Sequence, residues 1–134
     1  MSAQLTKFLH QLDLPFEKRS RRSLAWAITL AQGMLKAQQK ELLDLLDILW
    51  ARPFSGGHIF GISGAPGVGK SHFIGAMGLL FRKMGKSVAV ISIDPSKELG
   101  GGSLLGDQGR MGALAQDDGA FLRALPGKGQ RGGL

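Results

Sequence analysis

Residues 64–71 read Gly64-Ala65-Pro66-Gly67-Val68-Gly69-Lys70-Ser71, and they carry more information about the fold than any other segment. They fit the pattern G-x-x-x-x-G-K-[ST], the loop that cradles the phosphates of a nucleoside triphosphate. Glycine suits such a loop because, without a Cβ atom, it lets backbone N–H groups approach the phosphates closely. Lys70 would supply positive charge to the β- and γ-phosphates, and the Ser71 hydroxyl would bind Mg²⁺. We therefore predict a phosphate loop with Lys70 as its catalytic residue.

The flanking sequence places this loop between a strand and a helix. Residues 58–63, His-Ile-Phe-Gly-Ile-Ser, are typical of a short buried strand. Over residues 71–84 the apolar side chains recur at helical spacing. They are Phe73, Ile74, Met77, Leu80, Phe81 and Met84. This order predicts an α/β fold of the P-loop NTPase type, with a parallel sheet that is incomplete within this chain.

A second strand is predicted after the helix. Gly85 lies where a C-cap glycine belongs, and residues 87–93 form the β-branched apolar run of a strand buried on both faces. Strand, loop, helix and strand in this order predict a right-handed βαβ unit. Asp94 then lies at the carboxyl end of the second strand, where ligands of parallel sheets bind. It is a candidate for Mg²⁺, a Mg²⁺-bound water or nucleophile alignment; the alternative is a loop carboxylate that caps the turn with Pro95.

Residues 100–107, Gly-Gly-Gly-Ser-Leu-Leu-Gly-Asp, form a glycine-rich segment after that strand. Such a segment beside the γ-phosphate would suit a nucleotide-responsive switch. Asp107 is a second candidate near Mg²⁺, with an exposed loop acid as the alternative. Residues 120–123 predict a short third strand.

The sequence divides into an N-terminal helical region, residues 1–57, and the N-terminal part of a P-loop domain, residues 58–134. Apolar spacing predicts a first helix over residues 5–12, a second that begins in the basic cluster 18–22, and a third over residues 38–50. The region is either a helical cap on the nucleotide domain or a partner-docking arm. We expect Trp26 and Trp50 to be packing anchors.

Composition limits the other functions. The net charge of +7 is compatible with nucleic-acid binding, but the positive residues are spread out apart from residues 18–22, so we predict no nucleic-acid partner. No run reaches about 18 apolar residues and residues 1–15 lack signal-peptide character, so we expect no membrane association. The absence of cysteine excludes disulfides and thiolate metal sites and suits the cytoplasm. The three histidines lack metal-ligand spacing.

Guanine is usually read by an N-K-x-D element, and this chain has no asparagine and no D-x-x-G element. Two clear strands and a short third one fall below the usual sheet of about five or six. We therefore expect a truncated chain that ends midway through its domain. From these residues alone, a non-catalytic nucleotide-binding or interaction fragment and another P-loop enzyme, such as a kinase or a transport-linked ATPase, remain open.

The ordered motifs resemble one family of P-loop proteins. The segments GISGAPGVGKS, VAVISIDPS and GGSLLGDQGRM, between Gly61 and Met111, are similar to the MeaB/ArgK GTPases, which include the human methylmalonic aciduria type A protein. RRSLAWAITL, from Arg21 to Leu30, resembles the helix before that family's GTPase core. Phe121-Leu122-Arg123 and Gly132-Gly133-Leu134 resemble the stretch toward its next helix.

This resemblance implies a GTPase that acts as a chaperone of a cobalamin-dependent acyl-CoA mutase, chiefly methylmalonyl-CoA mutase. It implies GTP and Mg²⁺ as cofactors and a homodimer formed through a C-terminal arm that is missing from this chain. The residues implied to contact the GTP phosphates are Gly64, Ala65, Pro66, Gly67, Val68, Gly69, Lys70, Ser71 and His72. Ser71 would bind Mg²⁺, with Asp94 and Asp107 near the metal and the switch. For the 134 residues alone, we expect weak GTP hydrolysis or none.

Overall fold

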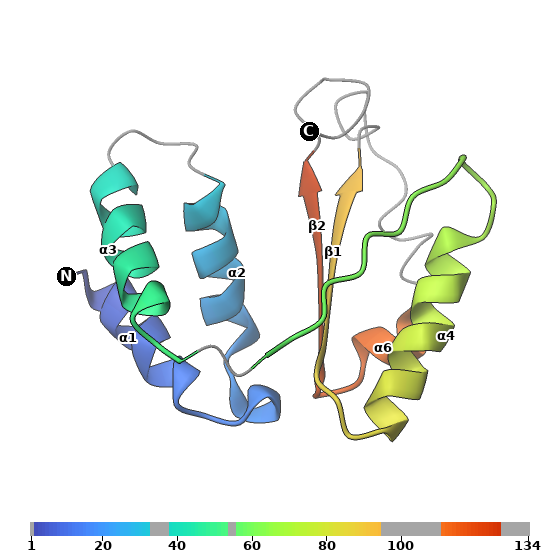
Figure 1. The fold of residues 1–134 in the computed structure, drawn as a ribbon, viewed down its shortest axis with the longest axis horizontal. Coiled ribbons are helices and arrows are strands. Elements are labelled where there is room, and N and C mark those ends of the chain that lie inside the picture. The colour runs from blue at the N-terminus through green and yellow to red at the C-terminus, as the bar shows by residue number, and fades with distance from the viewer. Residues whose placement is uncertain (1, 33–37, 54–55, 95–110, 127–134) are drawn as a thin grey trace. The chain divides into compact units, whose positions relative to one another are not determined.

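The structure is a computed structural model that describes residues 2–32, 38–53, 56–94 and 111–126. The chain divides into two compact units, Met1–Phe60 and Gly61–Leu134, each described by itself below. Figure 1 shows helices in the first unit, and helices with a strand pair in the second. No helix in the described ranges is long and apolar enough to cross a membrane.

Within residues 2–32 and 38–53, the first unit has three α-helices, as the sequence predicts. They are α1 (Ala3–Leu12), α2 (Arg21–Ala31) and α3 (Gln39–Trp50), with a short 3₁₀ helix at Phe16–Lys18. Serine caps the first two helices: the Ser2 side chain accepts from the amide of Leu5, and the Ser20 side chain accepts from the amide of Ser23. Pro15 precedes the 3₁₀ helix, and because proline has no backbone N–H it cannot donate the hydrogen bond that would continue α1.

Leucine and phenylalanine side chains from all three helices form the core of this unit. Its buried members are Leu5, Phe8, Leu30 and Leu45. Trp26 packs against this core, with its ring centroid 5.9 Å from that of Phe8 and the two planes tilted by 54°. The expectation that Trp26 is a packing anchor is therefore confirmed.

The same expectation for Trp50 is wrong. The Trp50 side chain is 85% exposed at the last position of α3. Helix geometry explains the difference. Leu45 is buried, and a residue five positions further along an α-helix is rotated by about 140° around its axis. The face of α3 that carries Leu45 into the core thus turns Trp50 away from it.

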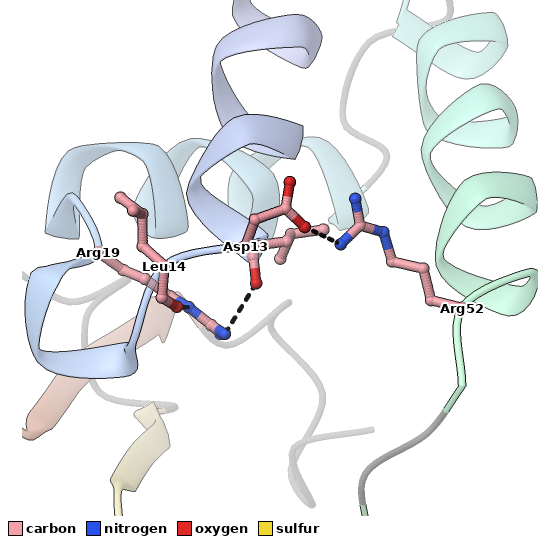
Figure 2. Close-up of polar contacts among 5 residues, drawn as sticks. Asp13, Leu14, Arg19 and Arg52 are labelled. Atoms are coloured by element: carbon pink, nitrogen blue, oxygen red, sulfur yellow. Dashed lines mark hydrogen bonds and ion pairs between the residues drawn. The ribbon is translucent and has the colours of Figure 1, made fainter.

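Polar contacts join the ends of these helices (Figure 2). The Arg19 guanidinium donates from Nη2 to the Leu12 carbonyl at 3.1 Å and from Nε to the Leu14 carbonyl at 3.0 Å. Since the last carbonyls of a helix lack intrahelical donors, Arg19 satisfies part of the carboxyl end of α1. Asp13 accepts from Arg52 at 2.9 Å, which connects the end of α1 to the residue two positions after α3. Both side chains of that ion pair are partly exposed, so it adds little stability.

The second unit contains a parallel strand pair covered by helices. Its elements within residues 61–94 and 111–126 are α4 (Lys70–Lys83), β1 (Val88–Asp94), the short α6 (Gly112–Ala115) and β2 (Ala120–Pro126). The two strands pair in parallel from Val88 opposite Ala120 to Asp94 opposite Pro126. The predicted helix at 71–84 and strand at 87–93 are confirmed. The strand predicted at 120–123 is present and runs to residue 126, because its whole length pairs with β1.

The strand predicted at residues 58–63 is not present. The structure assigns these residues no helix or strand, and Ile59 is 98% exposed. An apolar run becomes a strand only where a neighbouring strand completes its hydrogen-bond ladder. In the described part of the chain, the ladder joins β1 to β2 and leaves residues 58–63 outside it. The βαβ unit expected around the loop is therefore replaced by the β1–β2 pair.

Helix α4 packs closely against α6 through a glycine. A Cβ atom added to Gly78 would overlap the Leu114 side chain, which is fully buried. Only the absence of a side chain at Gly78 allows this approach. Leu114 thus fixes the middle of α4 against the segment that leads into β2.

The end of α4 is held by an arginine. Arg82 donates from Nε to Asp117 at 2.6 Å and from Nη1 to the Lys86 carbonyl at 2.7 Å. The same Asp117 oxygen accepts from the amide of Gly119 at 2.8 Å. A Cβ atom on Gly119 would overlap the Arg82 guanidinium, so the arginine lies directly over this glycine. These contacts fix the end of α4 to the start of β2.

We predict that Gly78→Ala destabilises the second unit. Overpacking of a filled site costs about 1–3 kcal/mol, partly offset by the better helix propensity of alanine, about 1 kcal/mol. The measurement is the free energy of unfolding in denaturant. Combining Gly78→Ala with Leu114→Ala should cost less than the sum of the two single changes, because the smaller side chain at residue 114 makes room for the new methyl group.

Gly112→Ala is the matched control, since a Cβ atom there has no neighbour within 4 Å. It should leave stability unchanged or raise it slightly. Equal free energies of unfolding for Gly78→Ala and Gly112→Ala would show that the close contact between α4 and α6 does not exist in solution.

Candidate phosphate-binding site

The predicted phosphate loop is closed by its own lysine. The Lys70 ammonium donates to the Gly64 carbonyl at 2.7 Å and to the Ala65 carbonyl at 2.8 Å. The first and last parts of the loop are thereby joined across the intervening residues. A lysine ammonium has three donors, so two hold the loop and one remains for a ligand. The structure thus brings together three of the residues predicted from the sequence.

Two glycines of the loop have backbone conformations that favour glycine. Gly67 has φ +77° and Gly69 has φ +91°, both in the left-handed region that costs other residues about 1–2 kcal/mol. A Cβ atom at either position would have no neighbour within 4 Å. The space beside both glycines is therefore open, as a loop that admits phosphate oxygens close to its backbone requires.

The N-terminus of α4 has donors to offer. Gly69 is the N-cap residue and provides no side-chain hydrogen bond, and the first turn contains no acidic residue. The first intrahelical bond runs from the Phe73 amide to the Gly69 carbonyl at 3.0 Å. The amides of Lys70, Ser71 and His72 therefore have no acceptor within the helix. Together with the positive end of the helix dipole, these amides favour a bound anion.

The remaining loop side chains differ in exposure. Val68 is 66% exposed, and one of its methyl groups lies 3.4 Å from the position that a Cβ atom on Gly64 would take. Pro66 and His72 are exposed, and Ser71 is half-buried in the first turn of α4. The Ser71 hydroxyl is therefore carried on the same turn as the free amides.

Of the two carboxylates predicted near the metal, only Asp94 lies within the described residues. Asp94 is the last residue of β1, as the sequence predicts. Figure 1 shows the carboxyl end of β1 and the first turn of α4 at the same end of the second unit. Asp107 lies outside the described residues, as does the rest of the glycine-rich segment 100–107. No group of three or more histidine, aspartate or glutamate side chains that could hold a metal ion occurs within the described ranges.

The bonds between Lys70 and the two carbonyls were not predicted from the sequence, which assigned this lysine to phosphates alone. Their acceptors are backbone oxygens, which every residue carries, so no side-chain pattern indicates them. The groups at this site nevertheless fit a nucleoside triphosphate and its Mg²⁺. They comprise one ammonium, three helix-start amides and one hydroxyl beside open glycine positions.

The sequence of this chain is similar to those of known proteins. Residues 24–134 match the family model described as methylmalonyl Co-A mutase-associated GTPase MeaB. The chain belongs to this MeaB family.

Curated relatives support the same family. GTPase ArgK of Escherichia coli is 42% identical over 114 residues, which cover 84% of this chain and 34% of ArgK. The mitochondrial methylmalonic aciduria type A homolog of Caenorhabditis briggsae is 41% identical over 125 residues, 86% of this chain and 30% of that protein. The mouse homolog is 33% identical over 145 residues, 100% of this chain and 34% of that protein. This MeaB-family chain thus spans about a third of the length of these relatives.

We predict that Gly69→Ala weakens the binding of Mg²⁺-GTP by about 5- to 30-fold. The reason is the cost of about 1–2 kcal/mol for a Cβ atom in the left-handed conformation that positions the first turn of α4. Isothermal titration calorimetry measures the affinity.

Gly61→Ala is the matched control, because Gly61 precedes the loop, has open space at its Cβ position and no left-handed φ. It should bind Mg²⁺-GTP as the unchanged chain does. If both variants bound equally well, the left-handed conformation of Gly69 would not be required for the site.

Proposed function

We propose that this chain binds the triphosphate of GTP, with Mg²⁺, through residues 64–72, as the phosphate-binding part of a MeaB-family GTPase. The observation that carries this proposal is the uncapped first turn of α4 beside a loop closed by Lys70. A side-chain cap or an acidic first turn would compete with phosphate for the same donors. This helix has neither.

Each residue has a distinct part in the proposed binding. Lys70 keeps the loop closed and donates its remaining hydrogen to a β- or γ-phosphate oxygen. The amides of Ser71 and His72 donate to phosphate oxygens, and the Ser71 hydroxyl binds Mg²⁺. Asp94 is proposed to hold Mg²⁺ directly or through water, and Asp107 to lie near the metal. GTP supplies the β–γ phosphoanhydride bond that a GTPase hydrolyses, and the charges of the loop stabilise its transition state.

The choice of GTP over ATP is supported by the family and not by the loop. The MeaB family is described as GTPases, and the ArgK relative carries that name. Residues 64–72 contact phosphates only, and those are the same in every nucleoside triphosphate. The proposal for guanine therefore depends on the family membership.

The partner is proposed on the same basis. The family description names a methylmalonyl Co-A mutase association, so we propose that the protein acts as a GTP-dependent chaperone of a cobalamin-dependent methylmalonyl-CoA mutase. Dimerisation through a C-terminal arm is proposed from the resemblance alone. The expected cytoplasmic location stays a prediction, since two of the relatives described above are named as mitochondrial.

We predict that Lys70→Ala lowers the affinity for Mg²⁺-GTP by about 1.5–3 kcal/mol for each charged hydrogen bond that is lost. Calorimetric titration of both chains measures the difference. Lys86→Ala is the matched control. This exposed lysine lies beyond the opposite end of α4, and the contact described for it uses its carbonyl and not its ammonium.

Lys86→Ala should bind as the unchanged chain does. Equal affinity in the unchanged chain and in Lys70→Ala would refute the phosphate-loop proposal, and equal losses in both lysine variants would indicate a general charge effect.

We also predict that GTP changes the affinity of this chain for a methylmalonyl-CoA mutase by about fivefold or more. Coupling between two ligands of one protein typically has this size and is reciprocal. The measurement is a titration of the purified mutase with and without Mg²⁺-GTP. Lys70→Ala should remove the effect of nucleotide while leaving the nucleotide-free affinity unchanged. Absence of mutase binding in both conditions would contradict the proposed partner.

A further inference from the structure

Helix α3 carries large apolar side chains on its exposed surface. Trp50 is 85% exposed, Leu43 is 60% exposed, and Leu46 and Leu49 are each 38% exposed. We call Leu43, Leu46 and Trp50 the apolar stripe, because Leu49 lies one helical turn after Leu45, on the side of α3 that faces the core. Leu43, Leu46 and Trp50 stand at i, i+3 and i+7, so they lie along one face of the helix. The stripe runs from Leu43 to Trp50, the last residue of α3.

The stripe is not needed for the core of its unit. Another face of α3 contacts the core: Leu45 is buried there, and Leu42 packs against the same core. Single exposed apolar residues are ordinary, but several that adjoin one another on one helix mark interaction surfaces. Tryptophan is also enriched among the residues that dominate binding energy at protein interfaces. Trp50, the most exposed member, lies at the end of the stripe.

Acidic side chains follow one edge of the stripe. Asp47 lies one helical turn from both Leu43 and Trp50, and Asp44 lies on the same side of the helix. Neither carboxylate makes an ion pair within the described part of the chain. Glu41 accepts a hydrogen bond from Ser2, and Lys40 is the one basic residue of α3. The helix is therefore acidic, although the chain has a net charge of +7.

We propose that the apolar stripe of α3 docks a basic amphipathic helix of a partner protein. A helix with apolar residues at i, i+3, i+4 and i+7 fits the spacing of the stripe, and lysine or arginine beside them would pair with Asp44 and Asp47. The acidic edge disfavours nucleic acid and anionic lipid, because both are negatively charged. A symmetric pairing of two α3 helices would bring the same acidic edges together, which disfavours a second copy.

The test uses Trp50 as a fluorescent reporter in the full chain. Trp26→Phe removes the second tryptophan and keeps an aromatic ring against Phe8. The probe is an 18-residue synthetic helical peptide with leucines at i, i+3, i+4 and i+7 and lysines elsewhere. Its control replaces every lysine with glutamate. We expect a saturable shift of Trp50 emission to shorter wavelength with the lysine peptide, weakened by added salt, and none with the glutamate peptide.

Matched variants locate the binding. Leu43→Ser should weaken binding of the lysine peptide by about tenfold or more, since burial of a leucine contributes on this scale. Leu80→Ser makes the same change at a site that is 57% exposed on α4, and it should leave binding unchanged. Circular dichroism should show the same helix content in both variants as in the unchanged chain.

Several results would overturn the proposal. Equal shifts with both peptides would show that charge has no part, and equal losses in Leu43→Ser and Leu80→Ser would show that the stripe is not the site. A dimer in sedimentation whose formation requires Leu43 would assign the stripe to a second copy. Emission at short wavelength in the free monomer, unchanged by peptide, would show that the chain itself covers the stripe.

Discussion

The amides at the start of α4 have no acceptor within the helix, and the chemistry of the second unit depends on this. A helix usually satisfies its first donors with a capping side chain, which adds about 1 kcal/mol of stability. Here Gly69 takes the N-cap position in a left-handed conformation and offers no side chain. The helix forgoes that stability, and Lys70 closes the loop through the Gly64 and Ala65 carbonyls instead. The same features leave the donors open to an anion.

Such a site works only if the helix behind it is fixed, and α4 is fixed at two places away from the loop. In its middle, Gly78 lets Leu114 approach the backbone. At its end, Arg82 binds Asp117 and lies over Gly119, at the start of β2. The position of the free amides is therefore set by the packing of α4 against α6 and the segment that leads into β2. Neither contact involves the loop. The residues of α4 that fix the helix are therefore different from those that offer donors to an anion.

Local features of this chain could be predicted from its sequence, and long-range ones could not. The loop motif, α4 and β1 follow from spacing and composition within short windows. Residues 58–63 have the composition of a strand, but a strand needs a partner, and composition does not show whether one is in place. Arg82 and Asp117 are 35 positions apart. Nothing in the sequence around either residue indicates that the two form an ion pair. The exposure of Trp50 depends in the same way on which face of α3 the core takes.

The described site also explains why nucleotide selectivity must come from elsewhere in a MeaB-family protein. Ammonium, amide and hydroxyl groups recognise phosphate oxygens, and the triphosphates of GTP and ATP are identical. A loop of this kind therefore contributes the same free energy to both nucleotides. Discrimination requires a group that reads the base edge, and aspartate with asparagine supplies it in the N-K-x-D element, which this chain lacks because it has no asparagine. In the proposed binding, affinity for the phosphates and preference for guanine would therefore be carried by different residues, and residues 64–72 would supply only the first.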